Sequence, residues 1–280
     1  MRPLVDLWHG INSHPWKTLQ YIFASFSVLF TLVRGITYFV PAIKIEGPFW
    51  LAVAVVASVI FGLGKVWKPS RIEIPIAKSS TVIEVIFGDL FVQDGIRVIA
   101  VSEFFDSKLG RLVSDKSLHG ILLQKCFGGH PEAFDKQVDE QLSSVESCEV
   151  KKVEGKCKSY PIGTTALVTV NQDRYVMFAL AKTDPNTCKV YSDISMMWGA
   201  LHELWRRLRI ESSGHAVNLP LVGSGSAGLG LPARDVLNLI ILSAITETKV
   251  REVTKRIRIV LHRVWFDNLD LRDVRRHWEE

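Results

Sequence analysis

A loop rich in glycine and serine is the segment best suited to bind a phosphate. Residues 220–229 read Pro-Leu-Val-Gly-Ser-Gly-Ser-Ala-Gly-Leu, between a predicted strand and a helix predicted to start at Pro232. Glycines let backbone N–H groups approach a phosphate, and a helix N-terminus adds partial positive charge. The sequence therefore predicts a diphosphate-binding loop, although a flexible connection without a ligand remains the alternative. The loop is neither a Rossmann fingerprint nor a Walker A motif, because the ribose-binding acid and the Gly-Lys-Ser/Thr are missing.

Other polar residues follow earlier predicted strands. Asp89, in Gly88-Asp89-Leu90, could accept a hydrogen bond from an adenine amino group, although Gly-Asp is also a common turn. Glu103 could bind ribose hydroxyls or a cationic group, and Phe104 could stack on a base, the alternatives being a solvated acid and a core aromatic. His119 is interpreted as a ligand contact rather than a general base, with a helix-surface histidine as the alternative.

The sequence suggests neither a metal site nor a catalytic set. Cys126, Cys148, Cys157 and Cys188 form no C-x-x-C pair, so we interpret them as reduced thiols in a cytosolic compartment. No Ser/His/Asp or Cys/His signature is present, and no catalytic residue is assigned. The net charge of +5 does not require a nucleic acid partner and also suits an anionic membrane surface.

Strands alternate with helices after Arg71, which predicts a three-layer α/β domain over residues 71–280. The predicted strands are Thr81–Phe87, Arg97–Val101, Thr165–Val170, Tyr175–Leu180, Val217–Leu221 and Ile257–Val264, and the predicted helices are Lys116–Cys126, Pro131–Ser144, Ile194–Leu208, Pro232–Thr246 and Leu271–Trp278. Glu146–Ser159 is polar and is predicted to be a surface insertion. The arginines of 206–209 and of the alternating stretch 255–263 are predicted to lie on solvated faces.

Residues 1–70 are predicted to form a transmembrane hairpin. Two apolar runs, with spans at about 18–40 and 48–66, approach the roughly 20 residues that a membrane-crossing helix needs. Pro41 ends the first run and Pro48 opens the second. A signal peptide is disfavoured because a second span follows without a cleavage site, and buried helices of a globular domain are the other alternative. Flanking basic residues, including Lys17, Lys65 and Lys68, predict that both termini are cytoplasmic.

The three polar segments together resemble the macro domain, an ADP-ribose-binding α/β/α fold, over most of Ile72–Trp278. The resemblance implies that Asp89 contacts adenine and that Ser102–Asp106 with Leu118-His119-Gly120 hold the distal ribose. It further implies that the late loop clasps the diphosphate. The implied ligand contacts are Asp89, Leu90, Ser102, Glu103, Phe104, Leu118, His119, Gly120, Pro220, Gly223, Ser224, Gly225, Ser226, Ala227, Gly228 and Leu229.

A two-span hairpin followed by a macro-like domain resembles the membrane-anchored macro effector of the bacterial Thoeris antiphage system. In that family a TIR-domain enzyme makes an ADP-ribose-type signal from NAD, and the effector binds it and damages the membrane. The resemblance implies an ADP-ribose derivative as ligand, such as histidine-ADP-ribose, and no other cofactor. It also implies homo-oligomerisation, an inner-membrane location and abortive infection, with the lipid bilayer as a partner and no nucleic acid.

One departure from the macro-domain pattern bears on catalysis. Macro domains that hydrolyse ADP-ribosyl bonds usually carry a Val-Asn-Ala-Ala-Asn segment, whereas this chain has Ile-Ala-Val-Ser-Glu at 99–103. Without the asparagine amides a catalytic water lacks its usual positioning, so we expect a receptor and not an enzyme. The alternatives are a membrane-tethered ADP-ribosyl hydrolase and a scaffold with an empty pocket.

Overall fold

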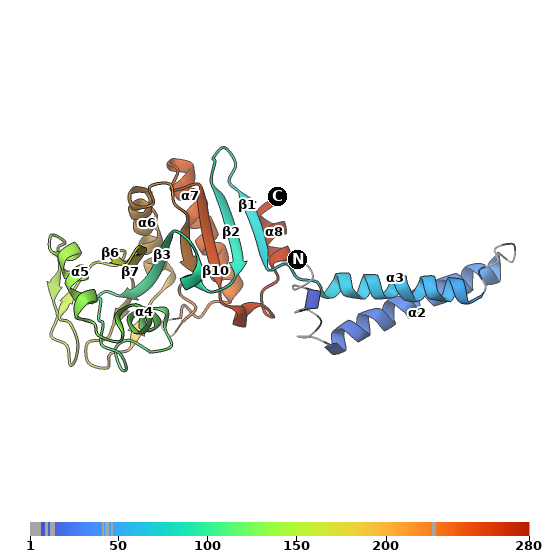
Figure 1. Ribbon diagram of the computed structural model, residues 1–280, viewed down its shortest axis with the longest axis horizontal. Helices are drawn as coiled ribbons and strands as arrows, with labels where there is room; N and C mark the ends of the chain where they lie inside the picture. The colour runs from blue at the N-terminus through green and yellow to red at the C-terminus, as the bar shows by residue number, and fades with distance from the viewer. Residues whose placement is uncertain are drawn as a thin grey trace. The chain divides into compact units, whose positions relative to one another are not determined.

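The chain divides into two compact units. A computed structural model describes residues 7–8, 11, 15–40, 42, 45, 47–225 and 228–279. The first unit comprises residues 1–70 with 270–272, and the second comprises residues 71–269 with 273–280 (Figure 1). The first contains two long apolar helices, and the second contains an eight-stranded sheet with helices on both faces.

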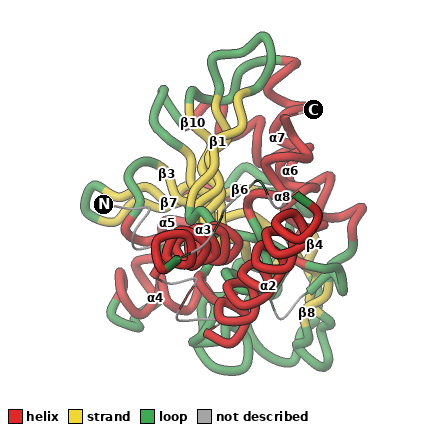
Figure 2. Tube along the Cα trace, turned by 90° about the vertical axis from the view of Figure 1, so that its right-hand side faces the viewer, coloured by secondary structure: helices red, strands yellow, loops and turns green. Residues whose placement is uncertain are grey.

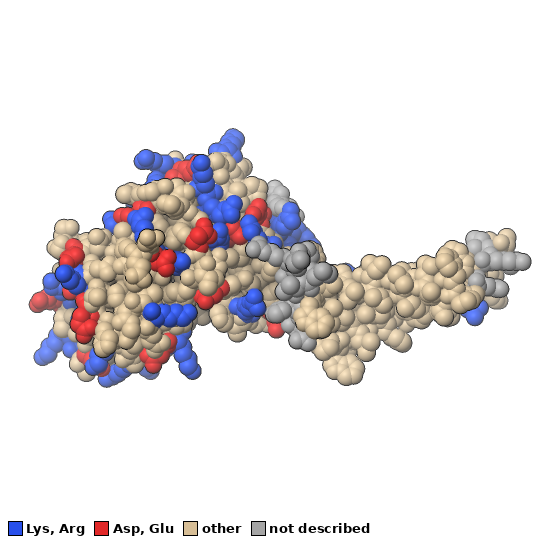
Figure 3. All heavy atoms as spheres, in the orientation of Figure 1, with Lys and Arg blue, Asp and Glu red and all other residues tan. Residues whose placement is uncertain are grey.

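Helices α2 (Pro15–Phe39) and α3 (Pro48–Val66) coincide with the two predicted spans. Their most apolar windows have mean hydropathies of 1.6 and 2.1, so both helices are long and apolar enough to cross a membrane. In this structure none of the most apolar stretch of α2 and 17% of that of α3 is buried. The core helices of a globular domain, in contrast, are mostly buried. Lys and Arg are correspondingly sparse along this unit in Figure 3. Pro41, predicted to end the first span, lies outside the described residues.

Small residues let α2 and α3 approach each other. Ser58 and Gly62 are the closely packed positions of α3, and Ser25 Oγ lies 3.3 Å from the Ser58 carbonyl oxygen. A Cβ at Gly62 would lie 2.4 Å from Cγ1 of Ile22. Such backbone proximity is the usual role of small residues between apolar helices. Arg34 is exposed, with its guanidinium 5.8 Å from the centre of the Phe30 ring.

The sheet of the second unit has the order β1-β2-β10-β9-β3-β7-β6, with β8 paired to β7. Five neighbouring strands, β2, β10, β9, β3 and β7, are parallel, whereas β1, β6 and β8 pair antiparallel. The strands are β1 (Arg71–Pro75), β2 (Val82–Phe87), β3 (Ile96–Ser102), β6 (Thr165–Val170), β7 (Asp173–Thr183), β8 (Val190–Tyr191), β9 (Val217–Pro220) and β10 (Arg256–Leu261). Because the five central strands are parallel, their carboxyl ends share one edge of the sheet.

Helices cover both faces of this sheet, as Figure 2 shows. Helices α4 (Leu118–Phe127) and α5 (Glu132–Leu142) pack on one face, where Leu122, Phe134 and Val138 are fully enclosed. Helices α6 (Ile194–Glu211) and α7 (Ala233–Val250) lie on the other, with Trp205 buried and its indole N–H donating to Ser243. The short turns η1 (Leu90–Val92) and η2 (Arg263–Trp265) and most of helix α8 (Leu271–Glu279), from residue 273 on, complete the unit. The predicted three-layer α/β architecture is confirmed.

Every predicted strand and helix of the second unit is present, with ends shifted by at most a few residues. The sequence analysis missed β1, a five-residue edge strand in which Ile72 and Ile74 alternate with charged neighbours. It also missed β8 and the β4 (Cys148–Glu149) and β5 (Lys158–Ser159) pair, which are two residues long each. Elements this short leave too few periods for a pattern to stand out.

The prediction that the arginines of 255–263 are all solvated is wrong for Arg258. Strand β10 lies inside the sheet, and the register places Arg258 between Glu84 of β2 and Asn218 of β9. Its guanidinium donates to Glu84 Oε2 at 3.2 Å, to Asp94 Oδ1 at 2.9 Å and to Asn218 Oδ1 at 2.9 Å. A buried charge requires such partners, and here neighbouring strands supply them.

The β6 edge of the sheet is occupied by a side chain. Gln137 of α5 accepts a hydrogen bond from the Thr169 N–H at 2.8 Å and donates one to the Thr169 carbonyl at 3.2 Å. An amide side chain has one donor and one acceptor group, so it pairs with a strand residue as another strand would. The outermost strand therefore has this backbone position satisfied.

Candidate ligand pocket

A pocket of about 470 Å³ lies at the carboxyl edge of the sheet. Its floor comes from the ends of β3, β7 and β9, including Val101, Leu180 and Pro220. This volume suits a small-molecule ligand, and the carboxyl edge of parallel strands is where open α/β sheets bind ligands. The lining residues are Ala100, Val101, Ser102, Asp106, Leu112, Val113, Ser114, Lys116, Ser117, Leu118, His119, Leu180, Ala181, Val190, Ser192, Pro220, Leu221, Val222, Gly223, Ser224 and Gly225.

One wall is the glycine-rich loop after β9. Gly223 adopts φ +80°, a conformation that favours glycine, and its carbonyl accepts a hydrogen bond from Leu229 N at 3.1 Å. Ser224 Oγ donates to the Leu221 carbonyl at 2.6 Å, which holds the start of the loop. A Cβ at Gly225 would meet no atom of the described residues within 4 Å. The loop is therefore shaped by its own hydrogen bonds and keeps space at Gly225 for a ligand.

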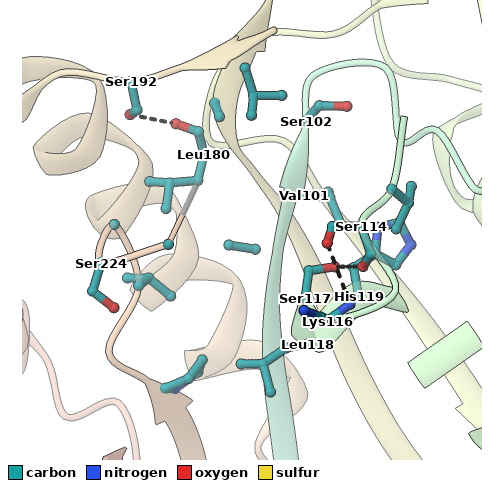
Figure 4. A pocket seen from close by; sticks show the side chains of 18 of the residues that line it. Val101, Ser102, Ser114, Lys116, Ser117, Leu118, His119, Leu180, Ser192 and Ser224 are labelled. Atoms are coloured by element: carbon teal, nitrogen blue, oxygen red, sulfur yellow. Dashed lines mark hydrogen bonds between the residues drawn. The ribbon is translucent and has the colours of Figure 1, made fainter. Parts of the chain in front are cut away.

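The opposite wall is the start of α4, seen with Ser224 across the pocket in Figure 4. Ser117 caps the helix, accepting from Gly120 N at 3.0 Å and donating to the Ser114 carbonyl at 2.7 Å. Ser114 and Lys116 complete this wall. A helix N-terminus beside a lysine gives the wall positive electrostatic character, which suits an anionic ligand.

His119 belongs to this wall of the pocket but is almost fully buried. Its ring lies 5.2 Å from the centre of the Phe134 ring, and Nε2 has no hydrogen-bond partner among the described residues. Burial, helped by the charge of Lys156, lowers the pKa of His119 to about 3. The imidazole is therefore neutral at physiological pH and adds no charge to the pocket.

The family of the chain is decided by a comparison of its sequence with known families. Residues 83–262, which include every pocket-lining residue, match the family described as Thoeris protein ThsA, Macro domain. The chain belongs to the Thoeris ThsA macro-domain family. A comparison with curated proteins finds no match to this chain.

Solved structures agree with the fold of this ThsA macro domain. An Oceanobacillus iheyensis macrodomain mutant with ADPR has 11% identity and a TM-score of 0.52, and the match covers 75% of this chain and 100% of that one. The same macrodomain with MES bound has 11% identity and a TM-score of 0.51, with 75% and 97% covered. With 11% sequence identity, this structural similarity establishes the fold alone, which is that of a macrodomain.

Seven of the predicted ligand contacts line the pocket of this ThsA macro domain: Ser102, Leu118, His119, Pro220, Gly223, Ser224 and Gly225. Gly228 and Leu229 lie further along the same loop, and Ser226 and Ala227 lie outside the described residues. From the sequence, we expected the helix that follows the loop to contribute its N-terminus to the phosphate site. That helix, α7, begins only at Ala233, eight residues after Gly225, the last residue of the loop that lines the pocket. The helix N-terminus at the pocket belongs to α4 instead.

The other predicted contacts have structural partners elsewhere in this ThsA macro domain. Asp89 caps η1 by accepting from Phe91 N at 2.9 Å, and Leu90 is in the core. Glu103 accepts from Thr183 N at 2.9 Å and from Thr183 Oγ1 at 3.2 Å, while burial raises the pKa of its carboxyl. Phe104 is buried, and so is Gly120, where a Cβ would lie 2.2 Å from the Ser114 carbonyl oxygen.

Sequence reasoning did not single out Lys116, Ser117 or Ser192 of the lining. Ser117 carried a recognisable signal, since serine before an apolar helical stretch is a typical N-cap. Ser192, whose hydroxyl donates to the Leu180 carbonyl at 2.9 Å, reaches the pocket only because β8 pairs with β7. That pairing was not visible in two residues of sequence.

Proposed function

We propose that this chain is a membrane-bound receptor for an ADP-ribose-type signal made from NAD by a TIR-domain enzyme. The supporting observation is the pocket between the Gly223–Gly225 loop and the N-terminus of α4, at the carboxyl edge of a macrodomain sheet. Backbone N–H groups and a helix N-terminus suit a diphosphate, and the hydroxyls of Ser102, Ser114 and Ser192 suit a sugar. Membership of the Thoeris ThsA macro-domain family supports the defence context.

We propose binding rather than turnover at this site. Among the described lining residues Asp106 is the single carboxylate, and it already accepts from the Lys152 ammonium and from Lys156 N at 2.8 Å. His119, which also lines the pocket, is buried and neutral. Hydrolysis needs a base positioned on a water, and these two groups are engaged or enclosed. Incubation with an ADP-ribosylated substrate is expected to release no ADP-ribose.

Gly225→Glu is expected to weaken the affinity for the signal by at least roughly 100-fold. A Cβ at residue 225 meets no described atom within 4 Å, so a side chain can start there without a clash, and its carboxylate brings a negative charge to the anionic ligand. The measurement is calorimetric titration of the full chain in detergent with NAD, ADP-ribose and histidine-ADP-ribose. Gly225→Gln, equal in size but uncharged, is the matched control and is expected to lose less. Absence of binding by the folded wild-type chain to all three ligands would leave the empty-scaffold alternative.

Signal binding is proposed to drive association of the chains and disruption of the membrane. A ligand shifts such an equilibrium only through its different affinities for the two states, and moving it from 1:99 to 99:1 needs about 5.5 kcal/mol. Association helps, because each bound chain adds to the same assembly. Dye release from liposomes containing the full chain should therefore need the signal and should be lost in Gly225→Glu.

The proposed location is the inner membrane, with α2 and α3 spanning it and both termini in the cytoplasm. The exposed thiols of Cys148 and Cys157 provide native labels for this topology. A membrane-impermeant maleimide is expected to label the chain in permeabilised spheroplasts and to leave it unlabelled in intact ones. A Cys148→Ser/Cys157→Ser variant controls for labelling elsewhere. Equal labelling before and after permeabilisation would place this unit on the opposite side.

A further inference from the structure

A buried ion pair stands in the wall of the pocket. Asp106 lies just after β3, is 4% exposed and belongs to the pocket lining. Its Oδ2 accepts from the ammonium of Lys152, and its Oδ1 accepts from Lys156 N at 2.8 Å. Both partners come from the polar insertion at 146–159, more than forty residues away in sequence.

The insertion is shaped to deliver Lys152 to this place. The Lys152 side chain is fully enclosed, and its ammonium lies 4.0 Å from the centre of the Phe104 ring. Gly155 adopts φ +92°, and a Cβ there would lie 2.3 Å from Asp106 Oδ1. Glycine at 155 thus lets the insertion backbone pass directly over the carboxylate. Although the segment was predicted to be a surface insertion, it buries one charged side chain.

Lys152 changes the sum of charges at the pocket. The described lining residues include three titratable ones, of which Asp106 is negative, Lys116 is positive and His119 is neutral. Lys152 cancels Asp106, which leaves Lys116 and the start of α4 to set a positive wall. Nearby Lys156 is itself ion-paired, with Nζ 2.7 Å from Asp135 and 3.2 Å from Asp139.

We propose that Lys152 is a specificity-determining residue, which acts through Asp106 to make the pocket accept anionic ligands. The inference rests on the proposed function, since it concerns the same pocket. Without Lys152, the carboxylate of Asp106 would have no ion-pair partner at the edge of the pocket. Because the protein interior has a low dielectric constant, that carboxylate would repel a diphosphate far more strongly than it would in water. The insertion therefore contributes to ligand choice without belonging to the pocket lining.

Three variants of the full chain in detergent test this by titration with ADP-ribose. Lys152→Met is expected to weaken binding at least tenfold, because Asp106 is left unpaired. Lys152→Met/Asp106→Asn removes both charges and is expected to return affinity to within about threefold of wild type. The control is Lys108→Met, which breaks an exposed 2.6 Å pair to Glu154 of the same insertion and should leave affinity unchanged. A double variant as weak as Lys152→Met would overturn the proposal.

A second readout separates charge from loss of structure. ADP carries one more negative charge than ADP-ribose, so Lys152→Met should weaken ADP binding by a larger factor. Equal factors for both ligands would mean that Lys152 only supports the fold, which contradicts the proposal. If Lys152→Met does not fold, Asp106→Asn decides through ligand preference: loss of the negative charge should raise the ratio of ADP affinity to ADP-ribose affinity above that of the wild type. An unchanged or smaller ratio overturns the inference.

Failure of the proposed function gives a different result. In that case the folded wild-type chain does not bind ADP-ribose, whatever residue 152 is. Inorganic pyrophosphate then replaces ADP-ribose as the probe, and the same order of variants is expected. Binding of pyrophosphate that is insensitive to Lys152→Met would overturn the charge inference as well.

Discussion

Replacing His119 with phenylalanine is expected to reduce how steeply the free energy of unfolding of this protein falls with falling pH. Burial, with the charge of Lys156, lowers the folded-state pKa of His119 to about 3, against 6.5 for the exposed side chain. Between these values the unfolded chain binds a proton that the folded chain does not. The free energy of unfolding therefore falls as pH falls, by about 1.4 kcal/mol per pH unit from this one group.

The measurement is denaturant unfolding of the full chain in detergent between pH 6 and pH 4.5. Within this window the wild type should lose about 2 kcal/mol through His119, and His119→Phe should lose little. Carboxyl groups with a lowered pKa, such as Asp94 beside the Arg258 guanidinium, lose their contribution to stability only as pH falls below 3.8. Glu103, whose pKa burial raises, acts in the measured window in the opposite direction. It does so equally in wild type and in His119→Phe, so the difference between their slopes reports His119. His130→Phe, at an exposed position, is the control and should keep the wild-type slope. Parallel slopes for wild type and His119→Phe would contradict the prediction.

Arg258→Met is expected to lower the free energy of unfolding by about 3 kcal/mol. The reason is that the buried carboxylate of Glu84 loses one of its ion-pair partners. The Glu84 side chain is 3% exposed and would keep only Arg71 at 2.9 Å and the more distant Arg256 at 3.7 Å. Asn218, also buried, would lose the donor to its side-chain oxygen. The change is read as a lower midpoint of chemical unfolding.

Arg206→Met is the matched control for this prediction. Arg206 and Glu203 form a 2.8 Å pair with side chains 60% and 53% exposed, and exposed pairs contribute less than about 1 kcal/mol. Glu84→Gln/Arg258→Met should recover part of the loss, since it removes the unpaired charge together with its partner. Equal midpoints for the Arg258 and Arg206 variants would show that the buried network contributes no more than a surface pair.

The regular elements and the glycine-rich wall were predictable because their signals are local. Alternation of apolar residues gave the strands, periodic apolar positions gave α6 and α7, and the glycines of 223–228 indicated a loop between a strand and a helix. Each of these signals lies within about twenty residues of sequence. Packing decides little about them, so the sequence alone was sufficient.

The rest of the site depends on which distant residues meet. Nothing near Asp106 in the sequence predicts that Lys152 will be its partner, because that contact requires the insertion to fold back over the end of β3. Glu103 looked available for a ligand, but the backbone and hydroxyl of Thr183, which the fold brings from 80 residues away, hydrogen-bond its carboxylate. Asp89 is exposed and uses one carboxylate oxygen to accept from the nearby Phe91 N, so its predicted role as an adenine contact stays a prediction. Arg258 looked solvated because strand order, which places it between β2 and β9, is not readable from an alternating pattern.

The amide of Gln137 has a consequence for how chains of this protein can assemble. An open edge strand invites another strand to add to it, and repeated addition produces fibres. At Thr169 the N–H and the carbonyl are already hydrogen-bonded to Gln137, so an incoming strand would first have to displace that side chain from α5. Growth of a continuous sheet from one molecule to the next is therefore opposed at this position of β6.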